Sequence, residues 1–309
     1  MTLYLDNAAS SHPKPEQVYQ AADDALRNIG ANPGRSGHKL AVRASQKIAR
    51  TRELLSRLFE IRDPNRIVFT ANATEAINLG LKGFLNPGDH VITSSMEHNS
   101  VVRPLRFLET QGVELTFVPC TPFGQMDTRT LEKAIRKNTR LIVLTHASNV
   151  TGGLMPIGKA ADLAHKNGAW LMVDAAQTAG LIPISVADIG IDLLAAPGHK
   201  GLWGPQGTGF LFIGPDISLR PLKEGGTGSQ SEMEFQPDFL PDCMESGTMN
   251  TPGIAGLGAG VEFLLHQGLA SIRAREMSLG RMIWNTLKQN HKIKLYGPEQ
   301  EEDRTSNIS

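Results

Sequence analysis

Seven short apolar runs alternate with helical patterns between about residues 15 and 215, and this alternation most constrains the fold. The runs are Arg66–Thr70, His90–Ser94, Glu114–Val118, Leu141–Thr145, Ala169–Asp174, Asp192–Ala195 and Gly209–Ile213. Continuously apolar, β-branched strands are typical of a mostly parallel sheet with helices on both faces. We therefore predict an α/β fold whose functional residues gather at the carboxyl ends of the strands.

Apolar residues recur at helical spacing before, between and after these strands. The predicted helices are Gln17–Arg27, Ala41–Phe59, Thr74–Lys82, Val101–Gln111, Asp127–Lys137, Gly158–Asn167, Ile254–Leu265 and Ile272–Gln289. The segment Arg220–Pro252 is rich in Gly, Pro and acidic residues, and such long connections are usually functional. Near the end of the chain, Ile293–Tyr296 is predicted to begin a further strand.

These elements indicate three parts: an N-terminal arm (1–14), a large domain (15–252) and a partial small C-terminal domain (253–309). The last part is too short to close a second compact domain unless the arm or a partner chain completes it. Because the sequence stops within the predicted final strand, we expect a chain that lacks part of its C-terminal domain.

The balance of charges narrows the range of partners. The chain has 31 basic and 31 acidic residues, so no net field favours nucleic acid or an acidic membrane surface. No signal peptide precedes the first motif, and no apolar stretch reaches the ~18 residues of a membrane span. Its two cysteines exclude a disulfide framework and a four-cysteine zinc site. We expect a cytoplasmic protein that acts on small molecules and holds no metal.

The motif PGHKGLWGPQGTG places Lys200 directly after an apolar run, among glycines that let the backbone approach a ligand closely. Lys200 is therefore a candidate nucleophile, although a lysine in a loop is more often only solvated. Asp174 ends the strand AWLMVD, and Gln177 follows it. A carboxylate at the end of a buried strand needs a cation or a strong hydrogen-bond donor as a partner, such as a protonated pyridine nitrogen. Alternatively, Asp174 only caps the helix that follows.

Three other strand ends carry polar candidates. Ala73 and Thr74 stand where a strand meets a helix, and free N–H groups there favour a phosphate. Thr74 has no acidic residue three positions later, so we expect its hydroxyl to be free for a ligand. His98 could stack on a flat ring, whereas a lone histidine is more often structural. Asn149 follows the next strand end.

Taken in order, the motifs YLDNAAS, ANATEAIN, EHNS, HASNVTG, VDAAQTAG and GHKGLWGPQGTG resemble those of class V aminotransferases. These are fold-type-I pyridoxal-phosphate enzymes, and the resemblance is to their cysteine desulfurases and selenocysteine lyases. It extends over essentially the whole chain. It implies the cofactor pyridoxal 5′-phosphate, the substrate L-cysteine or a related amino acid, a sulfur-acceptor protein and a homodimer with shared sites.

The resemblance also implies a role for each matching residue. Lys200 would form a Schiff base with the cofactor and shuttle the α-proton, and Asp174 would keep the pyridine nitrogen protonated. The other contacts would be Gln177 on the phenolic oxygen, His98 on the ring face, Asn149 on a ring substituent, Ala73, Thr74 and His199 on the phosphate, and Thr248 on a neighbouring subunit's phosphate. Arg35 and His38 resemble a stretch near the substrate, although an ordinary polar loop explains them equally well.

Some residues depart from the family pattern. Pro197 stands where many relatives carry a phosphate-binding serine, and it has neither a hydroxyl nor an N–H group. The sulfur-accepting cysteine and the carboxylate-binding arginine of the family would lie beyond Ser309. Cys120 is expected to be a core or strand-end residue, and Cys243 does not match the family's nucleophile.

We therefore predict a cysteine desulfurase-like enzyme that is impaired or inactive as this chain. Another class V aminotransferase or a β-lyase acting on a different amino acid is an alternative, because a transaminase needs no protein thiol. A second alternative is a remnant that keeps the fold without catalysis, which Pro197 and the missing C-terminal region favour.

Overall fold

A seven-stranded sheet forms the centre of the computed structural model, which describes residues 3–34, 37–230 and 232–309. In spatial order the strands are β1 (Ile67–Thr70), β7 (Gly209–Ile213), β6 (Leu193–Pro197), β5 (Trp170–Asp174), β4 (Thr139–Thr145), β2 (His90–Ser94) and β3 (Glu114–Val118). Only β7 runs antiparallel to its neighbours. The predicted mostly parallel α/β sheet is confirmed, and all seven strands lie within two residues of their predicted bounds.

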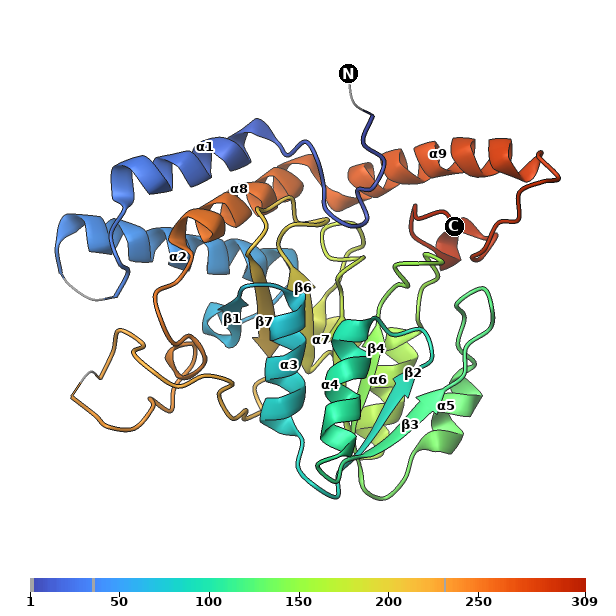
Figure 1. Ribbon diagram of the computed structural model, residues 1–309, viewed down its shortest axis with the longest axis horizontal. Helices are drawn as coiled ribbons and strands as arrows, with labels where there is room; N and C mark the ends of the chain where they lie inside the picture. Colours follow the sequence, from blue (N-terminus) through green and yellow to red (C-terminus); the bar gives the residue numbers. More distant parts are fainter. Residues whose placement is uncertain (1–2, 35–36, 231) are drawn as a thin grey trace.

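Helices cover both faces of this sheet (Figure 1). One face carries α3 (Ala73–Phe84) and α4 (Asn99–Glu109). The other carries α2 (Lys39–Leu58), α5 (Thr128–Ala134), α6 (Ile157–Lys166), α7 (Val186–Ile189) and α8 (Thr251–Gln267). Successive residues of β4 pack into opposite cores, with Ile142 and Leu144 on one side and Leu141 and Val143 on the other. This two-sided burial explains why the strands appear in the sequence as continuous apolar runs.

The chain ends wrap around this sandwich. Helix α1 (Glu16–Asp24) continues into a π-helical turn, Ala25–Ile29, and lies beside α8 (Figure 1). Helix α9 (Leu269–Lys288) follows α8. Leu257 and Leu264 of α8 belong to the same core as the sheet, and the division at residue 252 stays a prediction. None of the described helices combines the length and apolar character of a membrane span.

The predicted strand at Ile293–Tyr296 is wrong. The Ile293 N–H donates to the Asn290 carbonyl in a turn, and the Tyr296 N–H donates to the Ser309 carbonyl. No described strand forms a ladder with this segment. The nearby β-type contact is an isolated bridge between Gly153 and Arg304. A strand requires such a ladder, so apolar character alone is not sufficient.

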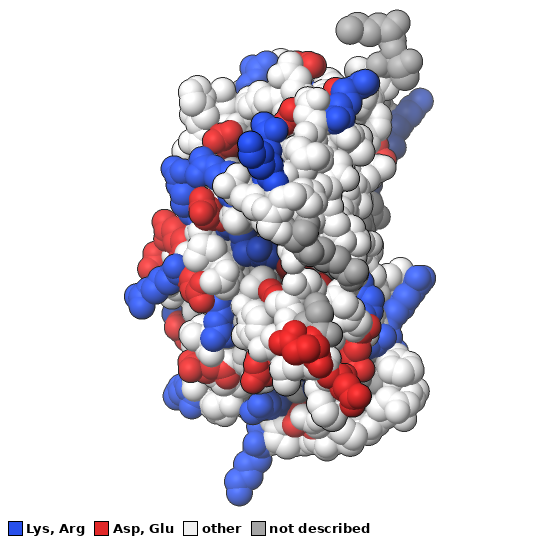
Figure 2. Space-filling model, turned by 90° about the vertical axis from the view of Figure 1, so that its left-hand side faces the viewer, with Lys and Arg blue, Asp and Glu red and all other residues white. Residues whose placement is uncertain are grey.

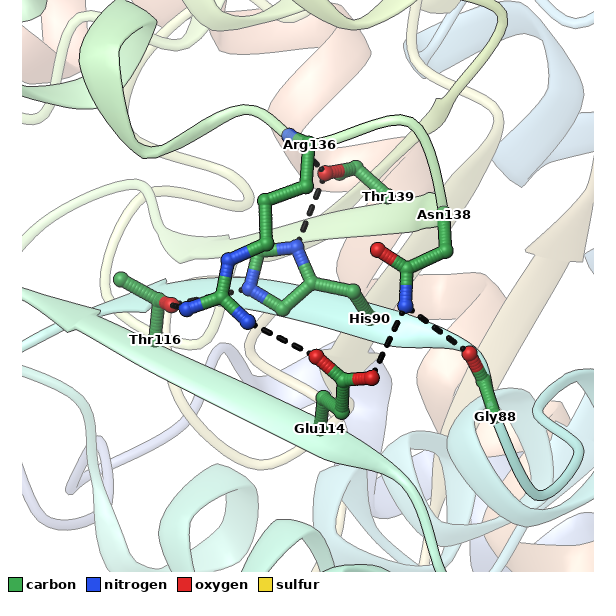
Figure 3. A network of polar contacts seen from close by, with 7 residues as sticks. All are labelled: Gly88, His90, Glu114, Thr116, Arg136, Asn138 and Thr139. Carbon is green, nitrogen blue, oxygen red and sulfur yellow. Dashed lines mark hydrogen bonds and ion pairs between the residues drawn. The ribbon is translucent and has the colours of Figure 1, made fainter.

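A polar network fixes the amino ends of β2, β3 and β4 (Figure 3). His90 is fully buried, and its two ring nitrogens lie 2.8 Å from the hydroxyls of Thr139 and Thr116. Arg136 donates to Glu114 at 2.7 Å and to Thr116 at 3.2 Å. Burial lowers the pKa of His90, so its ring is neutral near pH 7. The pairing of β2 with β4 shifts register between His90 and Val91, next to this network. The network lies at the amino ends of the strands, and their carboxyl ends are not part of it.

Charged side chains are mixed over the face shown in Figure 2, which lies at the left-hand side of Figure 1. Both basic and acidic groups are present there, with several acidic groups close together in the lower half, and broad uncharged areas lie between the charged groups. On the helices toward this side, Leu26, Leu40 and Val42 are exposed apolar side chains. Phe235, in the long segment after β7, is 82% exposed. These residues provide apolar surface on a protein whose basic and acidic side chains balance in number.

Candidate functional site

A cavity of about 180 Å³ opens at the carboxyl ends of the parallel strands. Its walls come from the ends of β4, β5 and β6 and from the first residues of α3 and α4. It is lined by Asn72, Ala73, Thr74, His98, Ser100, Thr145, Ala147, Asn149, Asp174, Ala176, Gln177, Pro197, His199 and Lys200. Eight residues predicted from the sequence are among these: Ala73, Thr74, His98, Asn149, Asp174, Gln177, His199 and Lys200. The fold therefore brings together residues that are up to 127 positions apart in the chain, from Ala73 to Lys200.

Lys200 and Asp174 both line this cavity, and the charge of each affects the pKa of the other. Lys200 stands in the turn after β6, and burial lowers the pKa of its amine, while Asp174 opposes that shift. Asp174 ends β5 and is 3% exposed. Burial raises the pKa of its carboxyl group, against the Ala176 N–H, Lys200 and His98, which favour the ionised form. The amine is therefore closer to its neutral, nucleophilic form than a lysine in water.

Asp174 and Lys200 each have a polar side-chain atom that could bind a ligand. Asp174 Oδ1 accepts a hydrogen bond of 2.9 Å from the Ala176 N–H, which orients the carboxyl group. Within the described residues, Asp174 Oδ2 accepts no hydrogen bond, and Lys200 Nζ takes part in neither a hydrogen bond nor an ion pair. A buried acceptor and a partly buried amine without partners are suited to bind a group that supplies both a donor and an electrophile.

The start of α3 differs from its predicted form in one respect. Asn72 caps the helix, and its Oδ1 accepts from the Glu75 N–H at 2.9 Å. This leaves the N–H groups of Ala73 and Thr74 without a protein acceptor among the described residues, as an anion site requires. The expectation of a free Thr74 hydroxyl is wrong, because it lies 2.9 Å from the Ser100 hydroxyl.

His98 is fixed by its own helix. It caps α4, and its Nδ1 accepts from the Ser100 N–H at 3.1 Å, with the Ser100 hydroxyl at 2.8 Å. Since Nδ1 is an acceptor, the neutral ring carries its proton on Nε2. Thr74, Ser100 and His98 thus form a chain of hydrogen bonds that joins the starts of α3 and α4 at the cavity wall.

The N-terminal arm contacts the turn that carries Lys200. Lys14 Nζ donates to the His199 carbonyl at 3.2 Å, and Ser11 Oγ donates to the Lys200 carbonyl at 3.0 Å. The Ser10 hydroxyl lies 3.2 Å from His199 Nδ1. Burial, followed by Lys200 and Lys14, lowers the pKa of His199. The arm therefore holds the turn that carries the lysine, a role that the sequence did not reveal.

Two predicted residues, Thr248 and His38, lie outside this cavity. Thr248 lines a separate cavity of about 210 Å³, together with Glu75 and Lys223. His38 caps α2 and accepts from the Ala41 N–H at 3.3 Å. Arg35 lies outside the described residues. The proposed roles of Thr248, His38 and Arg35 stay predictions.

Neither cysteine lines the cavity. Both thiols are free, and burial raises the pKa of each. Cys120 follows β3, and Cys243 is buried in the short helical turn Asp242–Met244. In the described part of the chain, His, Cys, Asp and Glu form no group of three that could bind a metal ion.

Several residues around the cavity were not predicted from the sequence. Asn72, Ser100, Thr145, Ala147 and Ala176 line it without having been singled out, whereas Pro197 was noted only as a departure. Behind the wall, the carboxyl group of Glu97 is buried, and burial raises its pKa to about 8. Its signal in the sequence was an acidic residue between a buried strand and the candidate His98.

Comparison with known proteins agrees with this fold. The family model for aminotransferase class-V matches residues 3–309, and the chain belongs to this family. A probable cysteine desulfurase of Methanothermobacter thermautotrophicus is 35% identical over 303 residues, which cover 96% of this chain and 75% of the relative. The chain is therefore similar to a probable cysteine desulfurase over nearly its whole length.

Solved structures place the chain in the same group. The apo structure of a cysteine desulfurase from Thermococcus onnurineus NA1 superposes with a TM-score of 0.91 at 30% identity, covering 99% of this chain and 78% of the other. The structure described as SspA in complex with cysteine has a TM-score of 0.75 at 32% identity and covers 84% and 72% of the two chains. The sheet is therefore that of the fold-type-I pyridoxal-phosphate enzymes.

Proposed function

We propose that this protein uses pyridoxal 5′-phosphate to take sulfur from L-cysteine and leave L-alanine. The observation that carries the proposal is the pairing of an unpartnered amine, Lys200, with a buried carboxyl group, Asp174, in one cavity. The family and its cysteine desulfurase relatives support the same chemistry. The structure described as SspA in complex with cysteine supports the choice of amino acid.

The residues present fit this cofactor by the chemistry of their donors and acceptors. The N–H groups of Ala73 and Thr74 at the start of α3, with His199, suit a phosphate. Asp174 Oδ2 suits a protonated ring nitrogen, and the Lys200 amine suits an aldehyde. His98, Asn149 and Gln177 supply the remaining walls: a flat ring and two amides. Pro197 offers no donor there, so backbone donors carry more of the phosphate binding.

The cofactor, when bound, supplies an aldehyde that condenses with amines and a cationic ring that withdraws electrons from the α-carbon. Asp174 holds the proton of the ring nitrogen, because its carboxylate has no other partner for Oδ2 among the described residues. Lys200 Nζ, depressed in pKa by burial, accepts the α-proton of the amino acid and later returns it. The N-terminal arm keeps the lysine turn in place through Ser11 and Lys14.

The thiolate of an acceptor would attack the sulfur of cysteine, so that an S–S bond forms as the bond between sulfur and the β-carbon breaks. The electron pair of that broken bond stays with the amino acid, whose β-carbon takes up a proton to give alanine, and the acceptor becomes a persulfide. Cys120 and Cys243 are thiols with raised pKa values outside the cavity, so we assign the acceptor role to neither. We propose that the thiol comes from a sulfur-acceptor protein or a small reductant. As a consequence, these 309 residues bind the cofactor and exchange amines but release sulfide slowly.

Transamination is the second candidate, and the position of the two cysteines favours it. An amino-group transfer needs Lys200 and Asp174 but no thiol, and no cysteine lines the cavity. Product analysis separates the two functions. Alanine and sulfane sulfur from cysteine indicate desulfuration, whereas a keto acid and a new amino acid indicate transamination.

A homodimer with shared sites is part of the proposal. Thr248 lies on a cavity away from Lys200 and is exposed. Its hydroxyl accepts a hydrogen bond from Asn32 Nδ2 at 3.3 Å and keeps its own proton to donate to a second chain. Exposed Leu26, Val42 and Phe235 supply apolar surface for such an interface. Light scattering tests it, with a mass near twice 33.5 kDa as the expected result. We place the dimer in the cytoplasm, since both cysteines are unpaired.

The deciding experiment is a spectrum of the purified protein with pyridoxal phosphate, before and after addition of L-cysteine. We expect a visible band that shifts with cysteine and that is absent in Lys200→Ala. Alanine and sulfane sulfur are then measured in the presence of a thiol. A protein that gains no band would be a remnant of the fold without catalysis, and the proposal would fail.

A further inference from the structure

One buried carboxyl group beside the cavity has no role in the chemistry described so far. Glu97 stands between the end of β2 and His98. Its Oε1 accepts from the Ser94 hydroxyl at 2.5 Å. The Thr145 N–H donates to Oε1 at 3.1 Å and to Oε2 at 2.9 Å. Every polar partner of this carboxyl group therefore lies at the carboxyl end of β2 or of β4.

These contacts connect two walls of the site. Thr145 lines the cavity and pairs in register with Asp174 of β5. The next residue, His146, donates its N–H to the Asp174 carbonyl at 2.9 Å. On the other side, the backbone of Glu97 leads directly into His98, which also lines the cavity. One carboxyl group thus fixes the strand beside Asp174 and the first residue of the His98 wall.

Burial of the Glu97 carboxyl group favours its neutral form. Burial raises its pKa to about 8, and the charge of Asp174 on β5 adds to this shift. The group facing it after β3 is Cys120, whose thiol Glu97 also affects. A second ionised carboxyl group near Asp174 would favour the charged form of the Lys200 amine. A neutral acid avoids this effect and still accepts the hydrogen bonds from Ser94 and Thr145.

A buried carboxyl group that must hold its proton opposes folding at neutral pH, and such costs are concentrated at functional sites. We propose that Glu97 is a positioning residue, whose carboxyl group joins the end of β4 to the His98 wall of the cofactor cavity. The inference rests on the proposed function for the identity of the cofactor. The anchoring of Thr145 and His98 is a property of the chain alone.

Three variants of Glu97 distinguish the effect of where its side-chain oxygen lies from the effect of its ionisable acid. Glu97→Gln keeps the length and an oxygen that can accept from Ser94 and Thr145. Glu97→Asp keeps the carboxyl group but withdraws it by one methylene, and Glu97→Ala removes it. Glu276→Gln is the control, because Glu276 is also a carboxyl group with a raised pKa, it accepts from Ser306 at 2.9 Å, and it lies outside the cavity.

The first readout is the dissociation constant of pyridoxal phosphate, measured by titration of the apoprotein, together with the visible circular dichroism of the bound form. We expect Glu97→Asp and Glu97→Ala to weaken binding about 10- to 100-fold, the range for groups that orient a site's ligands. Glu97→Gln should stay within about threefold of the parent, and Glu276→Gln should bind unchanged. A parent-like Glu97→Asp beside a weakened Glu97→Gln would show that the acid, not its reach, is needed, and would overturn the proposal.

The second readout is hydrogen exchange of the Thr145 amide in the apoprotein. It should accelerate in Glu97→Asp and Glu97→Ala and remain slow in Glu97→Gln. If the parent protein binds no pyridoxal phosphate, the proposed function fails while this exchange still tests the anchoring. Unchanged exchange in both Glu97→Asp and Glu97→Ala contradicts the proposal, and Glu97→Asp decides the matter if Glu97→Ala does not fold.

Discussion

Replacing Glu97 with Gln should make the protein more stable, by an amount that increases with pH. In the folded protein the pKa of Glu97 is about 8, against an ordinary value of 4.5. Between these two values the folded state holds a proton that the unfolded state has released. Stability therefore falls as pH rises through this window. At about 1.4 kcal/mol per pKa unit, the shift corresponds to about 5 kcal/mol at pH 8 and above.

Glutamine removes this titration because it never ionises. The free energy of unfolding is measured by urea denaturation of both proteins at pH 5, 6, 7, 8 and 9. We expect the stability difference to favour the variant increasingly, by up to about 1.4 kcal/mol for each pH unit from 5 to 8, and then to level off. Glu276→Gln serves as a comparison for general pH effects. A difference that stays constant across this range would show that Glu97 ionises normally and would refute the account of its burial.

Three further outcomes follow from other buried groups. Burial lowers the pKa of His146 to about 4 from 6.5, so it should contribute about 3 kcal/mol of stability that is lost as pH falls from 6.5 to 4, and His146→Asn should flatten this loss in urea denaturation. Arg52 and Glu245 form a buried ion pair at 2.6 Å. Arg52→Met should cost about 3 to 5 kcal/mol in unfolding free energy, because it leaves the Glu245 carboxylate buried without its cation. Replacing both Cys120 and Cys243 with Ser should leave alanine production unchanged with an added thiol acceptor; a loss would assign the sulfur to one of them.

The strands could be predicted because strands buried on both faces appear in the sequence as continuous apolar runs. Apart from Arg140 and Trp170, the residues of β4 and β5 are buried on one face or the other, so the apolar runs largely coincide with the strands. Helix ends were less accurate, since they depend on capping side chains. Capped by Asn72, α3 begins at Ala73, one residue before its predicted start. Capped by His98, α4 begins at Asn99, two residues before its predicted start. Ile293–Tyr296 failed because a strand needs a partner that a local pattern does not supply.

The site could be predicted to the extent that parallel strands align their carboxyl ends. That rule placed Asp174 and Lys200 in one cavity, although 26 residues separate them. Contacts between distant segments could not be derived from it. Lys14 meets His199 across 185 positions, and the exact position of Glu97 depends on Thr145 from another strand. Such partners are set by the packing of whole elements rather than by any motif.

The covalent role of Lys200 is the central claim, and reduction of the holoprotein with borohydride followed by peptide mapping tests it most directly. We predict one pyridoxyl group per chain on the peptide that contains Lys200, and loss of the visible band in Lys200→Ala. A label on Lys14, which contacts the same turn through the His199 carbonyl, or no label at all, would contradict the account.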